Sequence, residues 1–442
     1  MKTASKPSLL AIDGGTPVRT QPLPWSLPGV PWIGGEELEL VSQVIRAQSP
    51  FRYYGPNHTG MADRLEREWC ERFGCRHALA VNSGTAALHI GLLALGIGPG
   101  DEVLVPGFMW VSCLSAIVRT GAIPRLVDID ESYNMDPDDL RAKIGPHSKA
   151  VLLVHMLGAT GRLNALTNVA RQSGLYLLED CAQALGASYQ GVPVGGFGDV
   201  AVFSFQLNKN LTSGEGGMIH CNDSEIYNRC YAIHDLGYIR NNEGRLASSD
   251  HHYKLWGVGS RMSELTAAFL LAQVRRLDLV LDDLRQTKRR LSQALSDMPN
   301  LRFRPLPDPA GDSCQSLTTV FEERNLARRM AEALRAEGIR GPNGSAVLVH
   351  TDELVHHWYF KNSSLTERCS NASDGFPWSH PANGFAREYS YESGTLPCCD
   401  SLSQRTLLHS LSCRFEPRDI EDIIAAYRKV SAALLHPDYA GV

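Results

Sequence analysis

Short apolar segments alternate with stretches of helical character between residues 78 and 221, and no other feature of the 442-residue chain constrains its fold as strongly. The apolar segments, rich in β-branched and aromatic residues, are HALAVNSG, EVLVPGF, IPRLVDI, AVLLVHM, LYLLED and VAVFSF. Helix-like stretches such as 86–95 and 165–173 separate them. Buried strands joined by helices are typical of a mostly parallel sheet that is covered on both faces. We therefore predict an α/β fold whose large domain has three layers around a mostly parallel sheet.

The segments on either side of this region differ in character. Residues 1–35 are rich in proline, glycine and tryptophan, which predicts an N-terminal arm that extends across another surface. Apolar stripes predict helices at 35–47 and 59–73, and one long helix over 261–295 that leads into a C-terminal domain. Residues 286–442 mix strand and helix patterns, end in a helix at 417–435, and predict a smaller α+β domain. The large domain then spans 36–285.

Composition narrows the class of protein. Hydrophobic residues make up 43% of the chain, charged residues 21%, and the net charge is −5, which favours a globular protein without a nucleic-acid or anionic-membrane partner. No apolar run reaches the ~18 residues of a membrane span. The N-terminus lacks the apolar region of a signal peptide, so we expect a cytoplasmic protein. The eleven cysteines are scattered, as expected of reduced thiols, and none has zinc-ligand spacing, so no metal site is predicted.

Ligands collect at the carboxyl ends of the strands in such a sheet, so the residues that follow each apolar segment are candidates for a site. Ser83, Gly84 and Thr85 stand at the start of a helix, where free backbone N–H groups and the helix dipole can bind a phosphate. Helix capping without a ligand is the alternative use of these residues. Trp110 follows the next segment and either stacks on a planar ring or packs in the core.

Asp180 and Lys209 carry the strongest chemical signal. Asp180 ends LYLLED, where an ionised carboxylate is expensive to bury without a cationic partner such as a pyridinium N–H; helix capping is again the alternative. Ser204 ends VAVFSF, and Lys209 follows in a loop before the glycine-rich turn GEGG, which permits close approach of the chain. A buried lysine has a lowered pKa and can form a Schiff base near neutral pH.

Five motifs occur in the order NSGTAAL, PGDEVLVPGF, EDCAQALGA, FSFQLNKNLTSGEGG and RMSELTAAFLLAQ. In this order they resemble the motif set of the DegT/DnrJ/EryC1/StrS family, which comprises fold-type I, pyridoxal-phosphate (PLP)-dependent aminotransferases of sugars and cyclitols. The resemblance is strong from about residue 8 to 285 and looser from 300 to 442. The opening IDGGTPVRTQPLP is most similar to branches that act on scyllo-inosose-type cyclitols or that synthesise 3-amino-5-hydroxybenzoate.

The resemblance implies a role for each matching residue. Lys209 would form the Schiff base with PLP and shuttle a proton between the substrate Cα and the cofactor C4′, and Asp180 would keep the pyridine nitrogen protonated. The remaining cofactor contacts would come from Gln183 at the phenolic oxygen, Trp110 against the ring, and Ser83, Gly84, Thr85 and Ser204 at the phosphate. One position departs from the family: Gly259 stands where members carry an asparagine that reaches the cofactor phosphate of the neighbouring subunit.

The resemblance also implies the reaction. L-glutamate or L-glutamine would donate an amino group to a keto or aldehyde group of a sugar, a higher-carbon sugar acid or a cyclitol, in the biosynthesis of an amino sugar or an antibiotic-like natural product. A homodimer would build each active site at the subunit interface. The alternatives are a PLP enzyme that carries out elimination or dehydration, and a regulatory protein with this fold.

Substrate residues are expected outside the cofactor motifs. The loop-rich residues 341–395 combine aromatic and basic side chains and form either the acceptor pocket or a surface excursion, and His350 and Arg387 are candidates there. Tyr53 and Tyr54 lie where relatives place a loop that leads to the active site. His155 ends AVLLVHM and either lines the substrate side or is a satisfied strand-end histidine.

Overall fold

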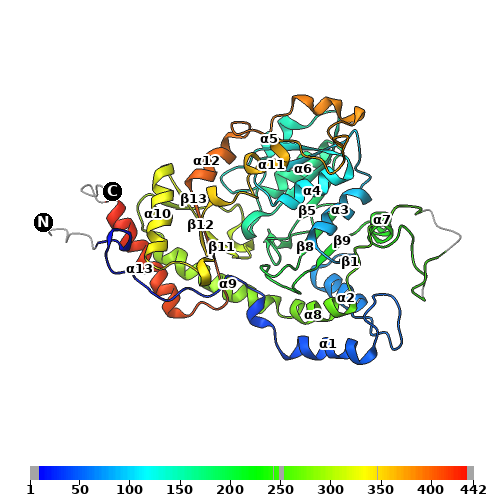
Figure 1. Ribbon diagram of the computed structural model, residues 1–442, viewed down its shortest axis with the longest axis horizontal. Coiled ribbons are helices and arrows are strands. Elements are labelled where there is room, and N and C mark those ends of the chain that lie inside the picture. The colour runs from blue at the N-terminus through cyan, green and yellow to red at the C-terminus, as the bar shows by residue number, and fades with distance from the viewer. Residues whose placement is uncertain (1–8, 242, 248–252, 346, 436–442) are drawn as a thin grey trace.

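A seven-stranded sheet forms the centre of the computed structural model, which describes residues 9–241, 243–247, 253–345 and 347–435 (Figure 1). The strand order is β1-β9-β8-β5-β4-β2-β3. In this sheet β9 runs antiparallel to β1 and β8, and the other neighbours are parallel, as predicted. The bounds are β1 His77–Val81, β2 Glu102–Pro106, β3 Ile123–Val127, β4 Ser148–Val154, β5 Tyr176–Asp180, β8 Val200–Ser204 and β9 Gly217–Cys221.

Helices cover both faces of this sheet because successive strand residues point to opposite sides. Leu79 and Val81 of β1 share a buried cluster with residues of α3 (Gly84–Ala94) and α4 (Val111–Thr120). Ala80, between them, packs instead with residues of α2 (Met61–Phe73) and α8 (Glu264–Val274). The predicted three layers are therefore confirmed. Within the described ranges, no helix is both long and apolar enough to cross a membrane.

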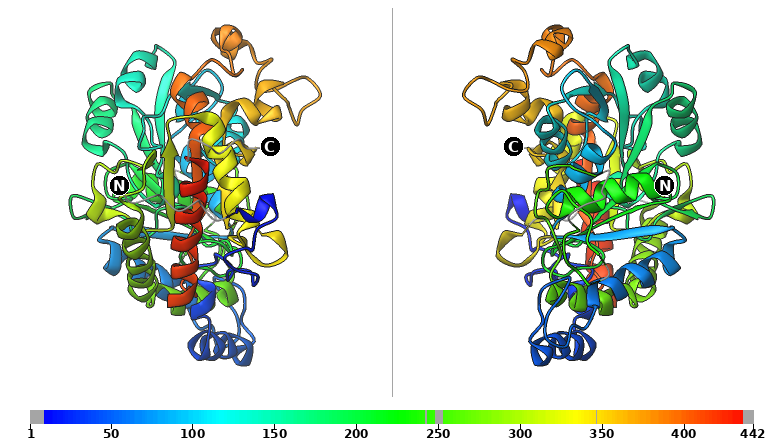
Figure 2. Two further views of the ribbon diagram at one scale, coloured as in Figure 1. Left: turned by 90° about the vertical axis from the view of Figure 1, so that its left-hand side faces the viewer. Right: turned by 90° about the vertical axis from the view of Figure 1, so that its right-hand side faces the viewer.

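A second, antiparallel sheet has the strand order β10-β11-β13-β12. Its strands are β10 Leu301–Phe303, β11 Ser316–Phe321, β12 Leu348–His350 and β13 Thr406–Ser410. It shares a hydrophobic core with α9 (Leu277–Leu295), α10 (Arg324–Ala336) and α13 (Pro417–Leu434), and the left view of Figure 2 shows this end with α13 in front. All four strands fall within the segment assigned to a small α+β domain, and the boundary at residue 285 stays a prediction.

The long helix predicted over 261–295 is two helices, so the prediction was wrong in this detail. α8 ends at Val274, α9 begins at Leu277, and Arg276 between them has φ −103° and ψ 3°. Arg275 and Arg276 bind the two oxygens of Glu36 in α1 (Gly35–Ala47) at 2.6 and 3.1 Å, which fixes the chain at the bend. Arginine is a good helix former, so the sequence carries no stop signal here.

The N-terminal arm crosses the small domain of the same chain, and residues 1–8 lie outside the described part. The backbone N–H groups of Ala11 and Val18 donate to the Glu337 carboxylate at 2.8 and 3.0 Å. Farther along, a Cβ on Gly29 would lie 3.0 Å from the carbonyl oxygen of Asn210. The arm therefore runs from the small domain to the loop that carries the predicted Schiff-base lysine.

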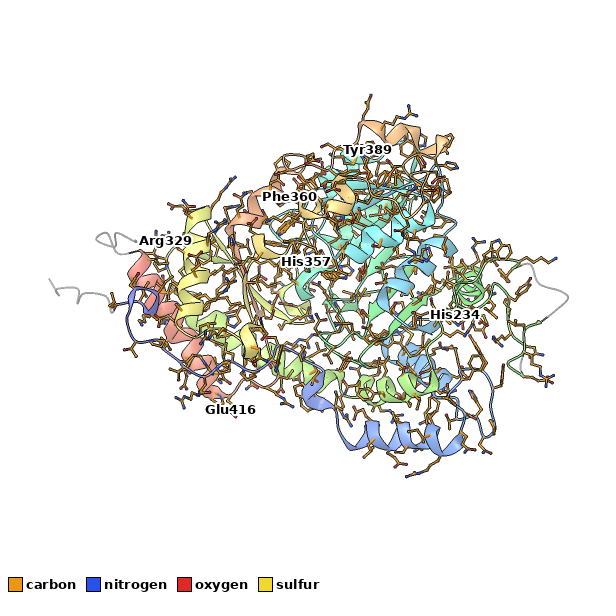
Figure 3. The ribbon with its side chains drawn as sticks, in the orientation of Figure 1. His234, Arg329, His357, Phe360, Tyr389 and Glu416 are labelled. Carbon is orange, nitrogen blue, oxygen red and sulfur yellow. The ribbon has the colours of Figure 1, made fainter. Side chains whose placement is uncertain are left out.

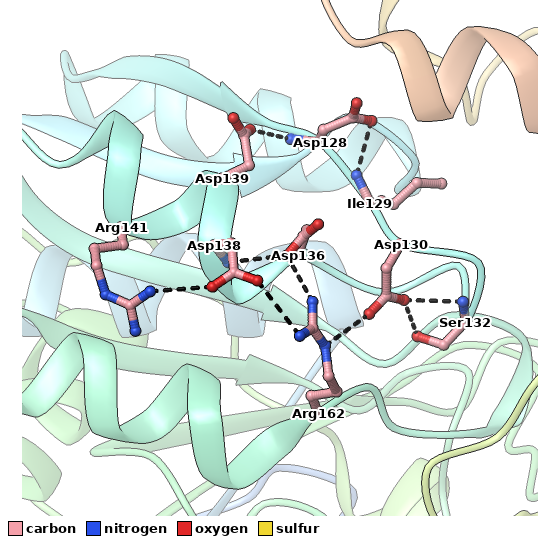
Figure 4. A network of polar contacts seen from close by, with 9 residues as sticks. All are labelled: Asp128, Ile129, Asp130, Ser132, Asp136, Asp138, Asp139, Arg141 and Arg162. Atoms are coloured by element: carbon pink, nitrogen blue, oxygen red, sulfur yellow. Dashed lines mark hydrogen bonds and ion pairs between the residues drawn. The ribbon is translucent and has the colours of Figure 1, made fainter.

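An acidic loop after β3 links the large sheet to the small domain. Arg162 donates to Asp130 at 3.2 Å and to Asp136 at 2.7 Å, which fixes the shape of this loop (Figure 4). Asp128, in the same loop, accepts the backbone N–H groups of residues 398 and 399 at 2.9 Å each, at the N-terminus of α12 (Pro397–Arg405). The adjacent cysteines at 398–399 thus belong to a contact between the domains.

Candidate active site

A cavity of about 400 Å³ lies at the carboxyl ends of β1, β5 and β8, beside the N-terminus of α3. All eight residues that the sequence assigns to the cofactor line it: Ser83, Gly84, Thr85, Trp110, Asp180, Gln183, Ser204 and Lys209. They meet because parallel strands end at the same edge of a sheet. Five further polar residues line the cavity without having been assigned to the cofactor from the sequence: Ser112, Gln206, Asn208, Glu215 and His357. Gln206, Asn208 and Glu215 belong to the same motif as Lys209.

The N-terminus of α3 forms one end of the cavity. The Ser83 hydroxyl caps the helix by accepting the Ala86 N–H at 3.1 Å, and the first helical N–H groups, those of Gly84 and Thr85, have no partner within the helix. A Cβ on Gly84 would lie only 2.7 Å from the Cβ of Ser204, so glycine allows the helix start and the end of β8 to approach closely. Two free N–H groups, a helix dipole and the Ser204 hydroxyl suit a phosphate.

Asp180 lies buried at the end of β5, 4% exposed. Its Oδ1 accepts the Ala182 N–H at 3.0 Å, and its Oδ2 accepts the Cys113 thiol at 3.3 Å. Burial raises the pKa of Asp180, although both hydrogen bonds and the nearby Lys209 ammonium act to lower it. A buried carboxylate with only two hydrogen-bond donors is costly unless a cation lies beside it, and a protonated pyridine nitrogen would serve as that cation.

Lys209 is half-buried in the turn that follows β8, and its backbone N–H donates to the Gln206 carbonyl at 3.0 Å. Burial lowers the pKa of Lys209 below its usual value, against the attraction of the Asp180 carboxylate. A lowered pKa raises the share of neutral amine, which is the form that attacks a carbonyl carbon. The cavity therefore contains an amine nucleophile, a buried carboxylate and a helix N-terminus that suits an anion.

Gln183 is oriented by the loop after β4. Its Oε1 accepts the Leu157 N–H at 3.1 Å, so its amide NH₂ is the group left to donate into the cavity. Leu157 has φ 58°, and its carbonyl accepts the Arg304 guanidinium of the small domain at 3.3 Å. Arg304 also donates to the Ser132 carbonyl at 2.6 Å. A buried arginine of the small domain therefore fixes the loop that orients Gln183.

His357 reaches the cavity from the small-domain segment 341–395. An antiparallel bridge pairs Phe108 with Trp358, and the Met109 N–H donates to the His357 carbonyl at 2.9 Å. The His357 ring lies 5.0 Å from that of Trp110, and Figure 3 shows it between the two domains. Burial lowers the pKa of His357 to about 4, so the ring is neutral at physiological pH.

Three predicted substrate residues lie outside the lining of this cavity. The Tyr53 hydroxyl bonds His234 at 2.7 Å, and Tyr54 is 55% exposed beside it. His155 is buried and bonds Glu179 at 2.9 Å, which favours the satisfied strand-end histidine. Glu179, His155 and Cys181 are close enough for a metal ion, but Glu179 already accepts four hydrogen bonds, from His155 and from the N–H groups of residues 195, 197 and 198.

The other two predicted substrate residues also lie away from the cavity lining. The buried His350 ring bonds the Gln404 carbonyl at 3.0 Å. Arg387 is exposed on the 3₁₀ helix Pro381–Glu388, part of an excursion that packs over the edge strand β3 through Tyr391, whose hydroxyl donates to the Pro124 carbonyl at 2.9 Å. The roles of Tyr53, Tyr54, His350 and Arg387 in substrate binding stay predictions.

Gly259 has φ +64°, a left-handed conformation, and nothing lies within 4 Å of where its Cβ would be. Asparagine tolerates this conformation better than most residues and glycine tolerates it best. The backbone conformation therefore suits asparagine and glycine alike, and glycine has no side chain to extend to a neighbouring subunit.

The fold and the cavity define the class of protein. A mostly parallel seven-stranded sheet, a buried aspartate at one strand end and a lysine in the turn after the neighbouring strand are the arrangement of fold-type I PLP-dependent enzymes.

Comparison with known proteins identifies the family. The DegT/DnrJ/EryC1/StrS aminotransferase family matches residues 31–376. The L-glutamine:2-deoxy-scyllo-inosose aminotransferase of Streptoalloteichus tenebrarius is 33% identical over 440 residues, 96% of this chain and 98% of that protein. GDP-perosamine synthase of Vibrio cholerae is 38% identical over 238 residues, 54% of this chain and 63% of that protein. The crystal structure of the aminotransferase TlmJ from Streptoalloteichus hindustanus is 27% identical with a TM-score of 0.73, covering 91% and 98% of the two chains. The chain belongs to the DegT/DnrJ/EryC1/StrS aminotransferase family and is an aminotransferase.

Proposed function

We propose that this aminotransferase binds PLP in the cavity between α3 and Lys209 and moves an amino group onto a sugar or cyclitol. One observation supports the proposal most strongly: Lys209, whose pKa is lowered, and the buried Asp180 carboxylate lie in the same cavity as the free N–H groups of α3. These three features match the carbonyl carbon, the ring nitrogen and the phosphate of one cofactor.

Each of these residues has a task in the proposed reaction. PLP supplies a carbonyl that bonds an amine and a ring that accepts the electrons of the Cα–H bond. Asp180 would hold a proton on the ring nitrogen, and the Gln183 amide would donate to the phenolic oxygen. Trp110 covers the ring. The Lys209 amine would remove the proton from the substrate Cα and would deliver it to the C4′ carbon of the cofactor, as transamination requires.

The substrates are proposed from the relatives and the family. L-glutamine or L-glutamate donates the amino group, and a keto or aldehyde group of a sugar, higher-carbon sugar acid or cyclitol receives it in a second half-reaction. The Streptoalloteichus tenebrarius relative is named for L-glutamine and 2-deoxy-scyllo-inosose, and the Vibrio cholerae relative for GDP-perosamine. We place the reaction in the cytoplasm and in the biosynthesis of an amino sugar or a related natural product.

We also propose a homodimer with the active sites at its interface. The described residues 236–241 and 253–258 expose large apolar side chains, with Trp256 94% and Leu236 48% exposed. Arg240 among them lies 4.4 Å from the centre of the Tyr53 ring. Large apolar groups exposed together mark an interaction surface. Trp256→Asp is expected to shift the protein from dimer to monomer in sedimentation analysis. A monomeric wild type contradicts the proposal.

One experiment tests the proposed reaction. Mixing the PLP-loaded protein with L-glutamine or L-glutamate should replace the visible absorption of the lysine-bound cofactor by the near-ultraviolet absorption of its aminated form. A keto sugar or keto cyclitol should then restore the visible absorption. If no amino donor changes the spectrum, the protein does not transaminate, and an elimination or dehydration by the same site becomes the better account.

A further inference from the structure

Two cysteine side chains meet at the turn between α2 and β1. Cys70 lies in the last turn of α2, and Gly74 caps this helix with φ 68° while its N–H donates to the Cys70 carbonyl at 2.9 Å. The left-handed cap turns the chain back, so that the Cys75 thiol donates to the Cys70 sulfur at 3.6 Å. All eleven cysteines lie in the described ranges, and within those ranges no other two are joined by a sulfur–sulfur hydrogen bond.

The two sulfur atoms are within reach of a covalent bond. A disulfide has an S–S distance of about 2.05 Å, so the sulfurs of Cys70 and Cys75 must approach by about 1.5 Å, which rotation of the two side chains can supply. Both side chains are half-buried, and Gly74 between them is exposed. A reagent in solution can therefore reach the pair, whereas thiols such as that of Cys113 are buried.

The contact between the two thiols gives them different reactivity. The hydrogen bond from Cys75 lowers the pKa of the Cys70 thiol, although burial and two nearby carboxylates act to raise it. The same hydrogen bond raises the pKa of Cys75. Because the thiolate is the nucleophile in thiol–disulfide exchange, Cys70 is the thiol that reacts first. The exposed guanidinium groups of Arg67 and Arg76 flank the pair in sequence and favour an anionic reagent.

We propose that Cys70 and Cys75 form a reversible dithiol–disulfide site that reacts with small anionic disulfides such as oxidised glutathione and, when oxidised, fixes the turn between α2 and β1. The Cys70 thiolate attacks one sulfur of the small disulfide, which gives a mixed disulfide and releases one thiol. Cys75 then loses its proton and attacks the Cys70 sulfur, which releases the second thiol. Two protein thiols are oxidised and one small disulfide is reduced to two thiols. Intracellular proteins use transient disulfides of this kind in redox sensing.

This site is separate from the proposed cofactor cavity and from the proposed dimer surface. β1 begins at His77, two residues after Cys75, and extends roughly 13 Å to Val81, which precedes the proposed phosphate site. Arg261, which follows the surface around Trp256, forms a bridge with Val81 at the same far end of β1. The proposal therefore does not depend on the proposed transamination.

Mass spectrometry can detect the cross-link directly, because Arg72 lies between the two cysteines. Trypsin places Cys70 in the peptide 68–72 and Cys75 in the peptide 73–76. The reduced, PLP-loaded protein is incubated with oxidised glutathione, its remaining thiols are alkylated, and the digest is analysed without reduction. The two peptides should appear joined and two hydrogens lighter than their sum, and dithiothreitol should separate them.

Substitutions separate this site from general thiol oxidation. Cys369→Ser removes an exposed cysteine elsewhere and should leave the yield of the cross-link unchanged. Cys75→Ser should instead retain glutathione on Cys70, because no second thiol displaces it. If Cys75→Ser does not fold, Cys70→Ser makes the complementary test and should carry neither the cross-link nor glutathione at this turn. Peptides 68–72 and 73–76 that stay unlinked in the wild type overturn the site.

Thermal unfolding tests what the cross-link does. The oxidised wild type should unfold at a higher temperature than the reduced wild type, because a cross-link lowers the entropy of the unfolded chain. Cys75→Ser should show no such increase under the same treatment. If the cross-link forms and the unfolding temperature stays the same or falls, oxidation does not stabilise the turn between α2 and β1, and that part of the proposal is overturned.

Discussion

Gly84→Ala tests whether the close approach of α3 to β8 builds the phosphate cradle. The added Cβ would lie 2.7 Å from the Cβ, 3.1 Å from the Oγ and 3.3 Å from the Cα of Ser204. Ordinary contacts begin near 3.4 Å, so Ser204 or the helix start must move by about 0.7 Å. Overpacking of this kind costs about 1–3 kcal/mol. The same displacement misaligns the groups proposed to hold the phosphate. If this energy is lost from binding, PLP affinity should fall about 10- to 100-fold, because each factor of ten corresponds to ~1.4 kcal/mol.

Titration of the cofactor-free protein with PLP, followed by absorbance, measures this affinity, and thermal unfolding of the same protein measures the cost of overpacking. Gly35→Ala is the matched control, because Gly35 is the first residue of α1 and nothing lies within 4 Å of its Cβ position. The control should keep wild-type affinity. Wild-type affinity in Gly84→Ala, or an equal loss in both variants, would mean that the close approach of α3 and β8 does not form the phosphate site.

Three further predictions follow from buried polar groups. Cys113→Ala removes a hydrogen bond to the Asp180 carboxylate and should weaken PLP binding about tenfold, because a hydrogen bond to a charged group is worth about 1.5–3 kcal/mol. Cys113→Ser keeps a donor to Asp180 and should bind PLP nearly as well as the wild type in the same titration. Equal losses in the two variants would show that the thiol does not support Asp180. Arg304→Met leaves buried carbonyls without donors and should lower the free energy of unfolding in urea by about 2–4 kcal/mol, with no loss if the guanidinium is dispensable. Burial lowers the pKa of His409 to about 4. As the pH falls below about 6.5, His409 of the unfolded chain binds a proton while the buried ring of the folded chain does not. The free energy of unfolding therefore falls by about 1.4 kcal/mol per pH unit between pH 6.5 and pH 4. His409→Leu should therefore show a smaller loss of unfolding free energy between pH 7 and pH 4.5, and an unchanged loss contradicts the assignment.

The sequence predicts the large sheet and its cofactor residues because each of them lies within a few positions of the end of an apolar strand. Asp180 ends β5, Ser204 ends β8 and Gly84 begins the helix after β1, so local pattern and parallel topology suffice to bring them together. Glycines such as Gly84 can be recognised from the motif, and the structure adds the reason, which is the close approach of Ser204.

Residues brought to the site over long sequence distances could not be predicted in this way. His350 and His357 lie in the same loop-rich segment, and nothing local distinguishes them. The bridge between Phe108 and Trp358 places His357 at the cavity, whereas His350 faces the Gln404 carbonyl. A smaller cavity of about 220 Å³ next to Lys209 has the same origin, since the arm, the small sheet and the loop of Lys209 that line it meet only in the folded chain.

Chemical trapping of the cofactor tests whether PLP is attached to Lys209. The PLP-loaded protein is reduced with borohydride, which makes a lysine-bound cofactor permanent, then digested and analysed by mass spectrometry. The label is expected on the peptide that contains Lys209, and Lys209→Ala should carry no label and show no visible cofactor absorption. Label on a different lysine, or visible absorption that persists in Lys209→Ala, would mean that Lys209 is not the residue that binds PLP.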